Sequence, residues 1–380
     1  MGKSKKKQKK KIGDGHIFYA YSEKEILLGK GINPDFEYSK STNANLDYIH
    51  RFWDNEEIYF ISNKDSLQAQ VTAMFRVTGK QPYSFNPENG LISPIAMYQD
   101  SNGRTSMNLE LEAFGSVFIV FNNTIVDLNH VTSIVKIESV KINKQLISSL
   151  RVSYNENGKI IFQPKKEGDY ELTLNDASIR NTTIAKNQPL MEFNGPWDVR
   201  FPHGWGFNPI QQFDTLLDWR HHSNKELSIF SGIGTYKTSF IIEKGSLSKD
   251  KIYSLNLGKV GEVAKVYLNG QEIGTKVFPP FNFELNNTLR EGANYLVVEV
   301  ANTWLNQLIG EANKPVEEQR TRSNLISMKE ANENLDGKKA SIQAGEMIIT
   351  RPWSNQLPTS SGLIGPVTLT SQQFITIVDK

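Results

Sequence analysis

The most constraining feature of this sequence is a long succession of short apolar runs, each bounded by Gly, Asn, Pro or Asp. Runs such as QAQVTAMFRVTG and GDYELTLN partly alternate apolar and polar residues, which is typical of strands that bury one face. A turn signal of the Asn-Gly type lies in NENGK at 155–159. Because no long helical pattern separates the runs, we expect antiparallel β-structure.

The segment VYLNGQEIGTKVFPPFNFEL, residues 266–285, predicts a hairpin and then a new strand. Asn269-Gly270 supplies the two residues that a tight turn with positive φ requires. Pro279-Pro280 ends the ladder because proline has no N–H to donate. Phe281 and Phe283 then alternate with polar neighbours. The segment therefore predicts a β-sandwich edge and turn rather than a sugar-binding surface.

The first eleven residues contain seven lysines and no acid, and the rest of the 380-residue chain holds 36 basic and 41 acidic residues. We interpret this start as a solvated, disordered tail. Weak contact with nucleic acid or anionic lipid is the alternative. The run has no apolar core, so it does not resemble a secretory signal peptide.

A short strand at Ile17–Ala20 and a helix near Ser22–Leu28 are expected next, with Ser22 and Glu25 in a capping-box pattern. One strand and one helix cannot bury a core, so they indicate the last part of a larger α/β domain. The predicted organisation is mainly β, and its parts are a basic tail at 1–12, an α/β remnant at 13–40, a β-sandwich at 41–186 and a second β-sandwich at 187–380.

The second sandwich resembles the galactose-binding-like jelly roll of many glycoside hydrolases. The resemblance rests on an ordered set of positions: Leu257-Gly258, Ala264, Val266, Leu268-Asn269-Gly270, Gly274 and Pro279-Pro280. Further segments occur in one order along the chain: NPDFEY (33–38), DYIHRFWDNEEIYFISN (47–63), FRVTGKQP (75–82), GPWDVRFPHGWG (195–206), TYKTSF (235–240), NTWLNQLIGE (302–311) and RPWSNQLPTSSGLIGPV (351–367). Together they resemble the C-terminal part of glycoside hydrolase family 106, the α-L-rhamnosidases, over roughly residues 14–375.

In that family the catalytic carboxylates and an associated calcium belong to a (β/α)8 barrel that precedes the region resembled here. This chain has no series of βαβ units long enough for such a barrel. The resemblance therefore implies a fold and a link to rhamnose-containing glycans and polysaccharide degradation, but no catalytic residues. It also implies a catalytic barrel, encoded upstream, as a partner. Family members are expected in the periplasm or outside the cell, and the location of this chain is unknown.

His50 and Arg51 are the first candidates for contact with sugar, since both donate hydrogen bonds to hydroxyl groups or a carboxylate. In an intact relative their strand could direct them towards the substrate of the barrel. A structural salt bridge between Arg51 and Asp54 or Glu57 is the competing interpretation.

A second candidate group combines tryptophan and histidine in the loops of the second sandwich. Aromatic rings stack on the apolar faces of sugars while neighbouring donors fix the hydroxyls. The candidates are Trp197, His203, Trp205, Trp219 and His221. Packing in the core or against loops is nevertheless the favoured interpretation for these tryptophans. Trp304 and Trp353 lie beside apolar strands and are expected in the core.

The composition excludes several other kinds of site. Without cysteine there is no disulfide, thiolate metal site or cysteine nucleophile. No HExxH, G-x-S-x-G or P-loop motif occurs, no apolar run spans a bilayer, and no pair of carboxylates stands out. His221 and His222 are adjacent, which disfavours a shared zinc because neighbouring strand residues face opposite sides. A structural calcium held by loop oxygens is expected as an option for a jelly roll, with ligands that the sequence does not locate.

The leading hypothesis is an accessory C-terminal β-sandwich portion of an α-L-rhamnosidase-like glycoside hydrolase, inactive without its barrel. The alternative is a stand-alone, non-catalytic carbohydrate-binding protein. A third hypothesis is an interaction protein that works through its basic tail. Whether this chain is itself an enzyme stays open on the sequence alone.

Overall fold

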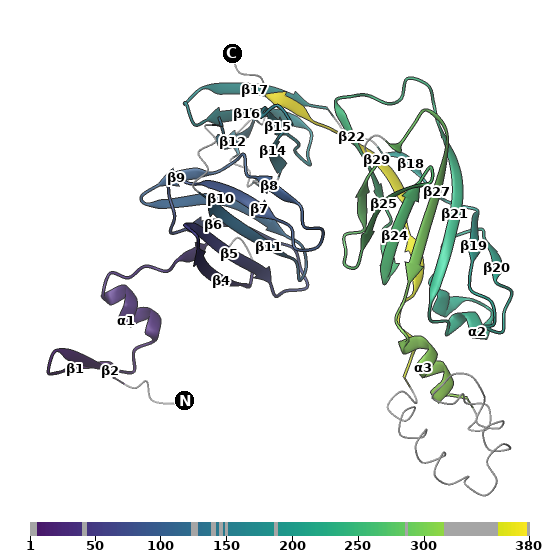
Figure 1. The fold of residues 1–380 in the computed structure, drawn as a ribbon, viewed down its shortest axis with the longest axis horizontal. Coiled ribbons are helices and arrows are strands. Elements are labelled where there is room, and N and C mark those ends of the chain that lie inside the picture. The colour runs from purple at the N-terminus through teal and green to yellow at the C-terminus, as the bar shows by residue number, and fades with distance from the viewer. Residues whose placement is uncertain are drawn as a thin grey trace, which may run out of the picture. The chain divides into compact units, whose positions relative to one another are not determined.

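The computed structural model describes most of the chain, in two compact units. The units comprise Met1–Phe162 with Asp169–Thr182 and Thr376–Lys380, and Gln163–Gly168 with Thr183–Ile375. The described residues are 6–39, 44–122, 128–137, 142–143, 147–148, 151–185, 189–285, 288–314 and 356–377. The fold is mainly β and built from antiparallel sheets (Figure 1), which confirms the predicted fold class.

The first elements of unit 1 are a hairpin, β1 (Gln8–Ile12) with β2 (Gly15–Tyr19), and helix α1 (Glu23–Gly29). The expected capping box is present, because the Ser22 side chain accepts from the Glu25 N–H and the Glu25 carboxylate accepts from the Ser22 N–H. The expected disordered tail is corrected at residues 8–12, which pair with β2.

Lysine side chains explain why this basic segment pairs with an aromatic one. The Lys9 ammonium lies 5.4 Å from the centre of the Phe18 ring, and Lys7 lies at the same distance from Tyr21. Lys7 also pairs with Glu25. These contacts offset part of the repulsion among the lysines.

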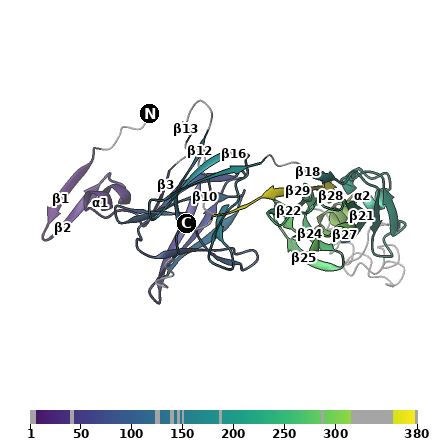
Figure 2. The same cartoon turned by 90° about the horizontal axis from the view of Figure 1, so that it is seen from above.

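Unit 1 continues as a sandwich of two sheets (Figures 1 and 2). In spatial order, one sheet contains β3 (Phe36–Tyr38), β6 (Ala69–Phe75), β10 (Arg104–Leu111) and β9 (Gln99–Ser101). The other contains β4 (Leu46–Trp53), β5 (Glu56–Asn63), β11 (Ser116–Asn122), β7 (Gln81–Phe85) and β8 (Ile92–Pro94). Inward residues of both sheets, such as Tyr59, Phe75 and Phe121, form one buried cluster. The strand at Phe36–Tyr38 belongs to this core, although the sequence assigned it to the preceding remnant.

Two smaller sheets complete the strands of this part of the chain. One contains β13 (Ile142–Asn143), β12 (Val131–Ile137), β16 (Gly168–Leu174) and β17 (Ile179–Ile184) in that order. The other contains β14 (Val152–Tyr154), β15 (Ile160–Phe162) and the C-terminal β30 (Ile375–Ile377). The Asn-Gly signal at 155–159 lies between β14 and β15, which pair antiparallel as predicted.

Unit 2 is the second sandwich, again with two main sheets. The larger contains β20 (Ile210–Phe213), β19 (Trp197–Arg200), β21 (Ile233–Ile242), β27 (Gly292–Ala301), β24 (Val263–Leu268) and β25 (Gln271–Lys276). The smaller contains β18 (Pro189–Glu192), β29 (Thr368–Gln373), β22 (Lys251–Asn256) and β26 (Asn282–Glu284). A short pair consists of β23 (Lys259–Gly261) and β28 (Gly362–Gly365), and the helical segments are η2 (Trp219–His221), α2 (Lys225–Ser228) and α3 (Leu305–Ala312).

The segment at 266–285 has the structure that its residues predict. Asn269 and Gly270 have φ of 53° and 84° and connect β24 to β25. Phe281 and Phe283 lie in the core between the two sheets. This stretch therefore determines architecture, with Phe281 and Phe283 buried and Phe278 exposed.

The side chain of Trp219 anchors one end of the unit 2 core. Its side chain is fully buried, and its indole N–H donates to the Tyr236 hydroxyl over 2.6 Å. The same hydroxyl accepts the N–H of Leu363 over 3.1 Å. Two glycines make room for the indole, because a Cβ at Gly234 or Gly362 would lie 2.6 or 2.4 Å from its atoms.

We predict that Gly362→Ala destabilises unit 2 by about 3 kcal/mol or more, because overpacking against a fully buried indole adds to backbone strain. Gly362 has φ +89°, a region that disfavours side chains. Urea unfolding followed by tryptophan fluorescence measures the change.

Gly245→Ala is the matched control. Gly245 has φ +81°, and an added Cβ there would meet nothing within 4 Å. We expect Gly245→Ala to lower the free energy of unfolding by about 1 kcal/mol, from backbone strain alone. Equal losses in the two variants would contradict the role assigned to the Trp219 contact.

Candidate functional site

Two of the tryptophans proposed to contact sugar are parts of the core. Trp197 and Trp219 are both fully buried. Their rings pack in a cluster with Phe193, Phe201 and Tyr236. A buried ring has no face for a ligand, so this structure removes both from the candidate group and supports the competing interpretation of core packing.

The other members of the group lie nearer to solvent. His203 and His221 are exposed, and Trp205 is half-buried. The Trp205 ring contacts Phe230 edge to face, with ring centres 5.0 Å apart. Phe230 is itself fully buried. Trp205 is therefore supported on its inner side by a buried ring.

Trp304 is the residue that sequence reasoning placed in the core and the structure places on the surface. Its exposed fraction is 57%. It is the N-cap residue of α3, a few residues after β27, and α3 extends from the end of the sandwich (Figure 1). The Trp304 and Trp205 rings have centres 6.1 Å apart and planes inclined by 39°. This correction brings a new aromatic side chain next to Trp205.

Helix α3 is held against the loop that carries Phe230. The Gln307 N–H donates to the Ser231 hydroxyl over 3.0 Å, and both residues are buried. Gly310 contacts Ile229 so closely that a Cβ there would lie 2.3 Å from an Ile229 methyl carbon. These contacts fix the position of the helix, and Trp304 at its start is held in place with it.

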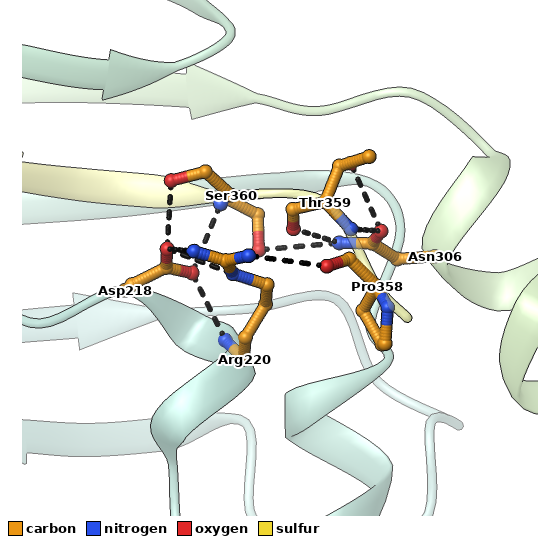
Figure 3. A network of polar contacts seen from close by, with 7 residues as sticks. Asp218, Arg220, Asn306, Pro358, Thr359 and Ser360 are labelled. Atoms are coloured by element: carbon orange, nitrogen blue, oxygen red, sulfur yellow. Dashed lines mark hydrogen bonds and ion pairs between the residues drawn. The ribbon is translucent and has the colours of Figure 1, made fainter. Parts of the chain in front are cut away.

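Asp218 is the centre of a polar network in unit 2 (Figure 3). Its carboxylate accepts from Arg220 Nε and Nη2 over 2.9 and 2.7 Å, and from the Ser360 hydroxyl over 2.7 Å. It also accepts the N–H of Arg220 and of Ser361, each over 3.1 Å. The network connects the loop before η2 to the segment that leads into β28.

A second bridge lies beside this network. The Asn306 side chain accepts from the Thr359 N–H over 2.7 Å and donates to the Thr359 carbonyl over 2.9 Å. Arg220 Nη1 donates to the Pro358 carbonyl over 3.2 Å (Figure 3). Asp218 lies in the loop before η2 and Asn306 lies in α3, and both bind the extended segment that leads into β28. Their role is therefore structural.

Burial by itself would raise the pKa of Asp218, but the hydrogen bonds from Arg220, Ser360 and the Ser361 N–H lower it to about 2. The carboxyl is therefore ionised at neutral pH. A glycosidase acid must instead stay protonated, which needs a raised pKa. Asp218 is unsuited to that role.

In unit 1, His50 lies between two carboxylates. Its Nδ1 is 3.1 Å from Asp35 and its Nε2 is 2.7 Å from Glu57. The ring stacks on Tyr59, with centres 4.1 Å apart and planes within 4°. Arg76 also pairs with Asp35. Both ring nitrogens of His50 are occupied, so its donors are directed within the protein.

Arg51 is exposed and pairs across the hairpin with Ile58. The competing interpretation paired it with Asp54 or Glu57. Within the described ranges Arg51 makes no ion pair, and Glu57 pairs with His50. Arg51 therefore stays a candidate for contact with a ligand.

A cavity of about 430 Å³ lies next to this cluster. Asp35, Tyr48 and Arg76 line it from the sandwich, and Lys24, Leu27 and Asn33 line it from α1 and the residues after it. Burial would raise the pKa of Asp35, but hydrogen bonds from His50 and Arg76 lower it. Leu28, Ile32 and Pro34 complete the lining, so the cavity combines one ion pair with largely apolar walls.

In the part of the chain that the structure describes, no group of three or more His, Cys, Asp or Glu is placed to hold a metal ion. Carbonyl-rich calcium sites do not depend on such a group, so a structural calcium stays a prediction. No helix among the described residues is long and apolar enough to cross a membrane.

Two family models match separate parts of the chain. Residues 2–100 match a family described as alpha-L-rhamnosidase. Residues 224–346 match a family described as the galactose-binding domain-like part of family 2 glycosyl hydrolases. Together they confirm the resemblance predicted from the ordered motifs. The chain is related to glycoside hydrolases.

Similarity to two individual proteins supports this relationship. A protein of Formosa agariphila named "Putative beta-glucuronidase" is 22% identical over an alignment of 516 residues that covers 90% of this chain. The structure of a rhamnosidase from Novosphingobium sp. PP1Y matches 96% of this chain, with a TM-score of 0.63 and 23% identity, and so shares the fold. This chain spans 44% of the first protein and 27% of the second.

We predict that Asp218→Asn destabilises unit 2 by about 3 kcal/mol at pH 7, because it leaves the guanidinium of Arg220 without its buried partner. The folded pKa of about 2 lies below the unfolded value of about 3.9. The carboxylate therefore contributes about 2 to 3 kcal/mol above roughly pH 4, which is lost as the pH falls towards 2.

Urea unfolding followed by tryptophan fluorescence suits this test, since Trp197, Trp205, Trp219 and Trp304 all belong to unit 2. The difference in the free energy of unfolding between the wild type and Asp218→Asn should become smaller from pH 7 to pH 3. The exposed neighbour Asp214 is the control, and Asp214→Asn should change stability by less than about 0.5 kcal/mol. A difference in the free energy of unfolding that stays constant across this pH range would refute the lowered pKa of Asp218.

Proposed function

We propose that this chain is an accessory β-sandwich portion of a glycoside hydrolase that acts on rhamnose-containing glycans, and that it does not hydrolyse them alone. The observation that carries the proposal is the match of residues 2–100 to the α-L-rhamnosidase family. The shared fold with a rhamnosidase, over 27% of that protein's length, is consistent with a part of a larger catalytic assembly.

The carboxylates of the described residues support a non-catalytic role. Glycoside hydrolysis needs one protonated and one ionised carboxyl on either side of the bond. Asp218 is bound by Arg220 and Ser360, and Asp35 and Glu57 are bound by His50. The pKa of Asp35 and of Asp218 is lowered, which opposes the acid role.

The partner in this proposal is a catalytic (β/α)8 barrel, encoded upstream of this chain. The described sheets contain at most six strands and none is a closed barrel. The sandwiches would then brace that partner, and loops of either unit would reach its substrate. Export to the periplasm or beyond accompanies this role.

A second candidate function is a stand-alone carbohydrate-binding protein. One observation favours it, namely the exposed Trp304, whose ring lies beside the half-buried Trp205. Large exposed aromatic side chains on a rigid support commonly indicate a binding surface. The two functions differ in whether a catalytic partner is required.

We predict no turnover of aryl α-L-rhamnosides or aryl β-glucuronides by the purified chain. Released nitrophenol at micromolar protein concentration over several hours measures this. A purified α-L-rhamnosidase is the positive control, and chain heated past unfolding is the blank.

Turnover that co-purifies with the folded chain through two different columns would contradict the proposal. Activity that emerges only when the chain is co-expressed with the product of the upstream reading frame would support the accessory role. Unchanged activity of that product without the chain would favour the stand-alone function instead.

A further inference from the structure

Among the strands that the structure describes, β4 is the one long edge strand of the unit 1 sandwich. The two sheets of this sandwich end in β3, β9, β4 and β8 (Figure 1). The other three edges are three residues long and β8 contains Pro94, whereas β4 has eight residues and neither proline nor lysine. Short strands, proline and lysine are common means of protecting an edge from a further strand. Because β4 lacks these means, it is open to pairing.

The ladder between β4 and β5 decides which backbone groups of β4 face outwards. The Lys64 N–H donates to the Asn45 carbonyl at the start of this ladder. Along an antiparallel strand, successive residues direct their N–H and C=O groups to opposite sides. Odd-numbered residues of β4 therefore bond to β5, and Tyr48, His50 and Phe52 direct their backbone groups away from it. These groups are the ones that a further strand would meet.

The outer-face side chains of β4 combine both signs of charge with an apolar residue. Asp47, Ile49 and Arg51 follow one another on this face, because side chains alternate along a strand. Ile49 is 55% exposed and the Asp47 side chain 65%, although Asp47 pairs with Lys64 over 2.9 Å. Arg51 is exposed, and within the described ranges it makes no ion pair. An acid and a base on either side of one apolar residue match a second copy of the same strand.

The two charges select one register for such a pair. Opposite residues of an antiparallel pair both face the gap or both face away, so the two-fold axis passes through a residue. With Ile49 on the axis, Asp47 of each copy lies opposite Arg51 of the other, where opposite charges stabilise the pair. Moving the axis by one residue either way puts Asp47 opposite an apolar side chain, and moving it by two brings like charges together.

The same register extends an apolar row that already crosses the sheet. Ile49 lies opposite Phe60, and Phe60 lies opposite Phe118 on β11. The two phenylalanine rings have centres 4.8 Å apart, and both side chains are partly exposed on the face away from the buried cluster. With Ile49 on the axis, this row continues directly into the same row of the second copy. Exposed apolar surface is thereby removed from water, which favours association.

We propose that this chain forms a two-fold dimer in which β4 pairs antiparallel with β4 of a second copy, with Ile49 on the axis. Tyr48 and His50 of the two copies exchange backbone hydrogen bonds, and two ion pairs between Asp47 and Arg51 lie on either side of Ile49. Because both copies use the same strand, the assembly closes at two chains. This interface goes beyond the proposed function and does not depend on it.

The new ladder is short, which bounds its strength. The Leu46 N–H points outwards but already donates to the Tyr38 hydroxyl over 3.3 Å, so the ladder is centred on Tyr48 and His50. A strand pair of this length buries less than the roughly 1,600 Å² of a standard interface. We therefore expect a dissociation constant in the micromolar range, with monomer and dimer in rapid exchange.

Analytical ultracentrifugation of the full chain, from about 1 to 200 µM, tests the dimer and its register. Arg51→Asp should raise the dissociation constant about tenfold or more, because the two-fold axis replaces two ion pairs with two repulsions at once. Asp47→Arg should do the same. The double variant with both changes restores the pairs with their signs exchanged, so its dissociation constant should return to within about threefold of the wild type. Lys159→Asp, a reversal at an exposed turn, should dimerise as the wild type does.

Hydrogen exchange gives an independent measurement of the same interface. The amides of Tyr48 and His50 should exchange more slowly as the wild-type concentration rises, and this dependence should be lost in Arg51→Asp. Asp47 and Arg51 are exposed, so circular dichroism should show a wild-type unfolding temperature for the dilute variants.

A wild type that stays monomeric throughout, or that grows beyond two chains, would overturn the inference. So would a dimer that tolerates both single reversals, a folded double variant that stays monomeric, or β4 amides that exchange at the same rate at every concentration. Loss in each single variant with recovery in the double variant supports the β4 interface. The turnover and co-expression experiments test the accessory role separately.

Discussion

The second sandwich depends on the burial of Trp219 and on the hydrogen bond from its indole N–H to Tyr236. The Tyr236 hydroxyl also accepts the N–H of Leu363, so one phenol joins a central strand, the loop helix η2 and the returning C-terminal segment. Burial raises the pKa of Tyr236 and keeps the phenol protonated. The adjacent Asp218 adds a charged bond to Ser360 on that same segment. Because these contacts close one end of the core, they also fix the loops that leave it.

The described tryptophans of unit 2 fall into two groups, one buried in the core and one nearer to solvent. Trp197 and Trp219 hold the core and have no accessible face. Trp205 and Trp304 lie outside it, supported by Phe230 and by α3. Trp219 and Trp205 both contact the ring of Phe230, so a buried and a partly exposed tryptophan share one support.

Sequence reasoning succeeded where a local signal determines the outcome. The Asn269-Gly270 turn, the capping box of Ser22 and the alternating strands all depend on neighbouring residues, and each was confirmed. It left Trp219 open between sugar contact and core packing, and it wrongly placed Trp304 in the core, because the exposed fraction of both side chains depends on contacts distant in sequence. Gly234 and Gly362 make the space for Trp219, and no local pattern reveals this.

The candidate site in unit 1 shows the same limit. His50 was correctly identified as a residue of interest, but its two carboxylate partners, Asp35 and Glu57, come from different strands or loops. The spacing of the acids gave no reason to choose these two. Family resemblance predicted the glycoside hydrolase relationship, and only the packed structure separated supporting residues from exposed ones.

The central claim is that buried Trp197 and Trp219 hold the fold of unit 2, while exposed Trp304 is the ring that a glycan would reach in the proposed carbohydrate-binding function. An NMR titration that follows the indole N–H signals, each assigned by substitution, tests it most directly. Addition of a rhamnose-containing oligosaccharide should shift the signals of Trp304 and Trp205 and leave those of Trp53, Trp197 and Trp219 in place. A spectrum in which Trp304 does not move at saturating ligand, or in which Trp53 moves instead, would contradict the account.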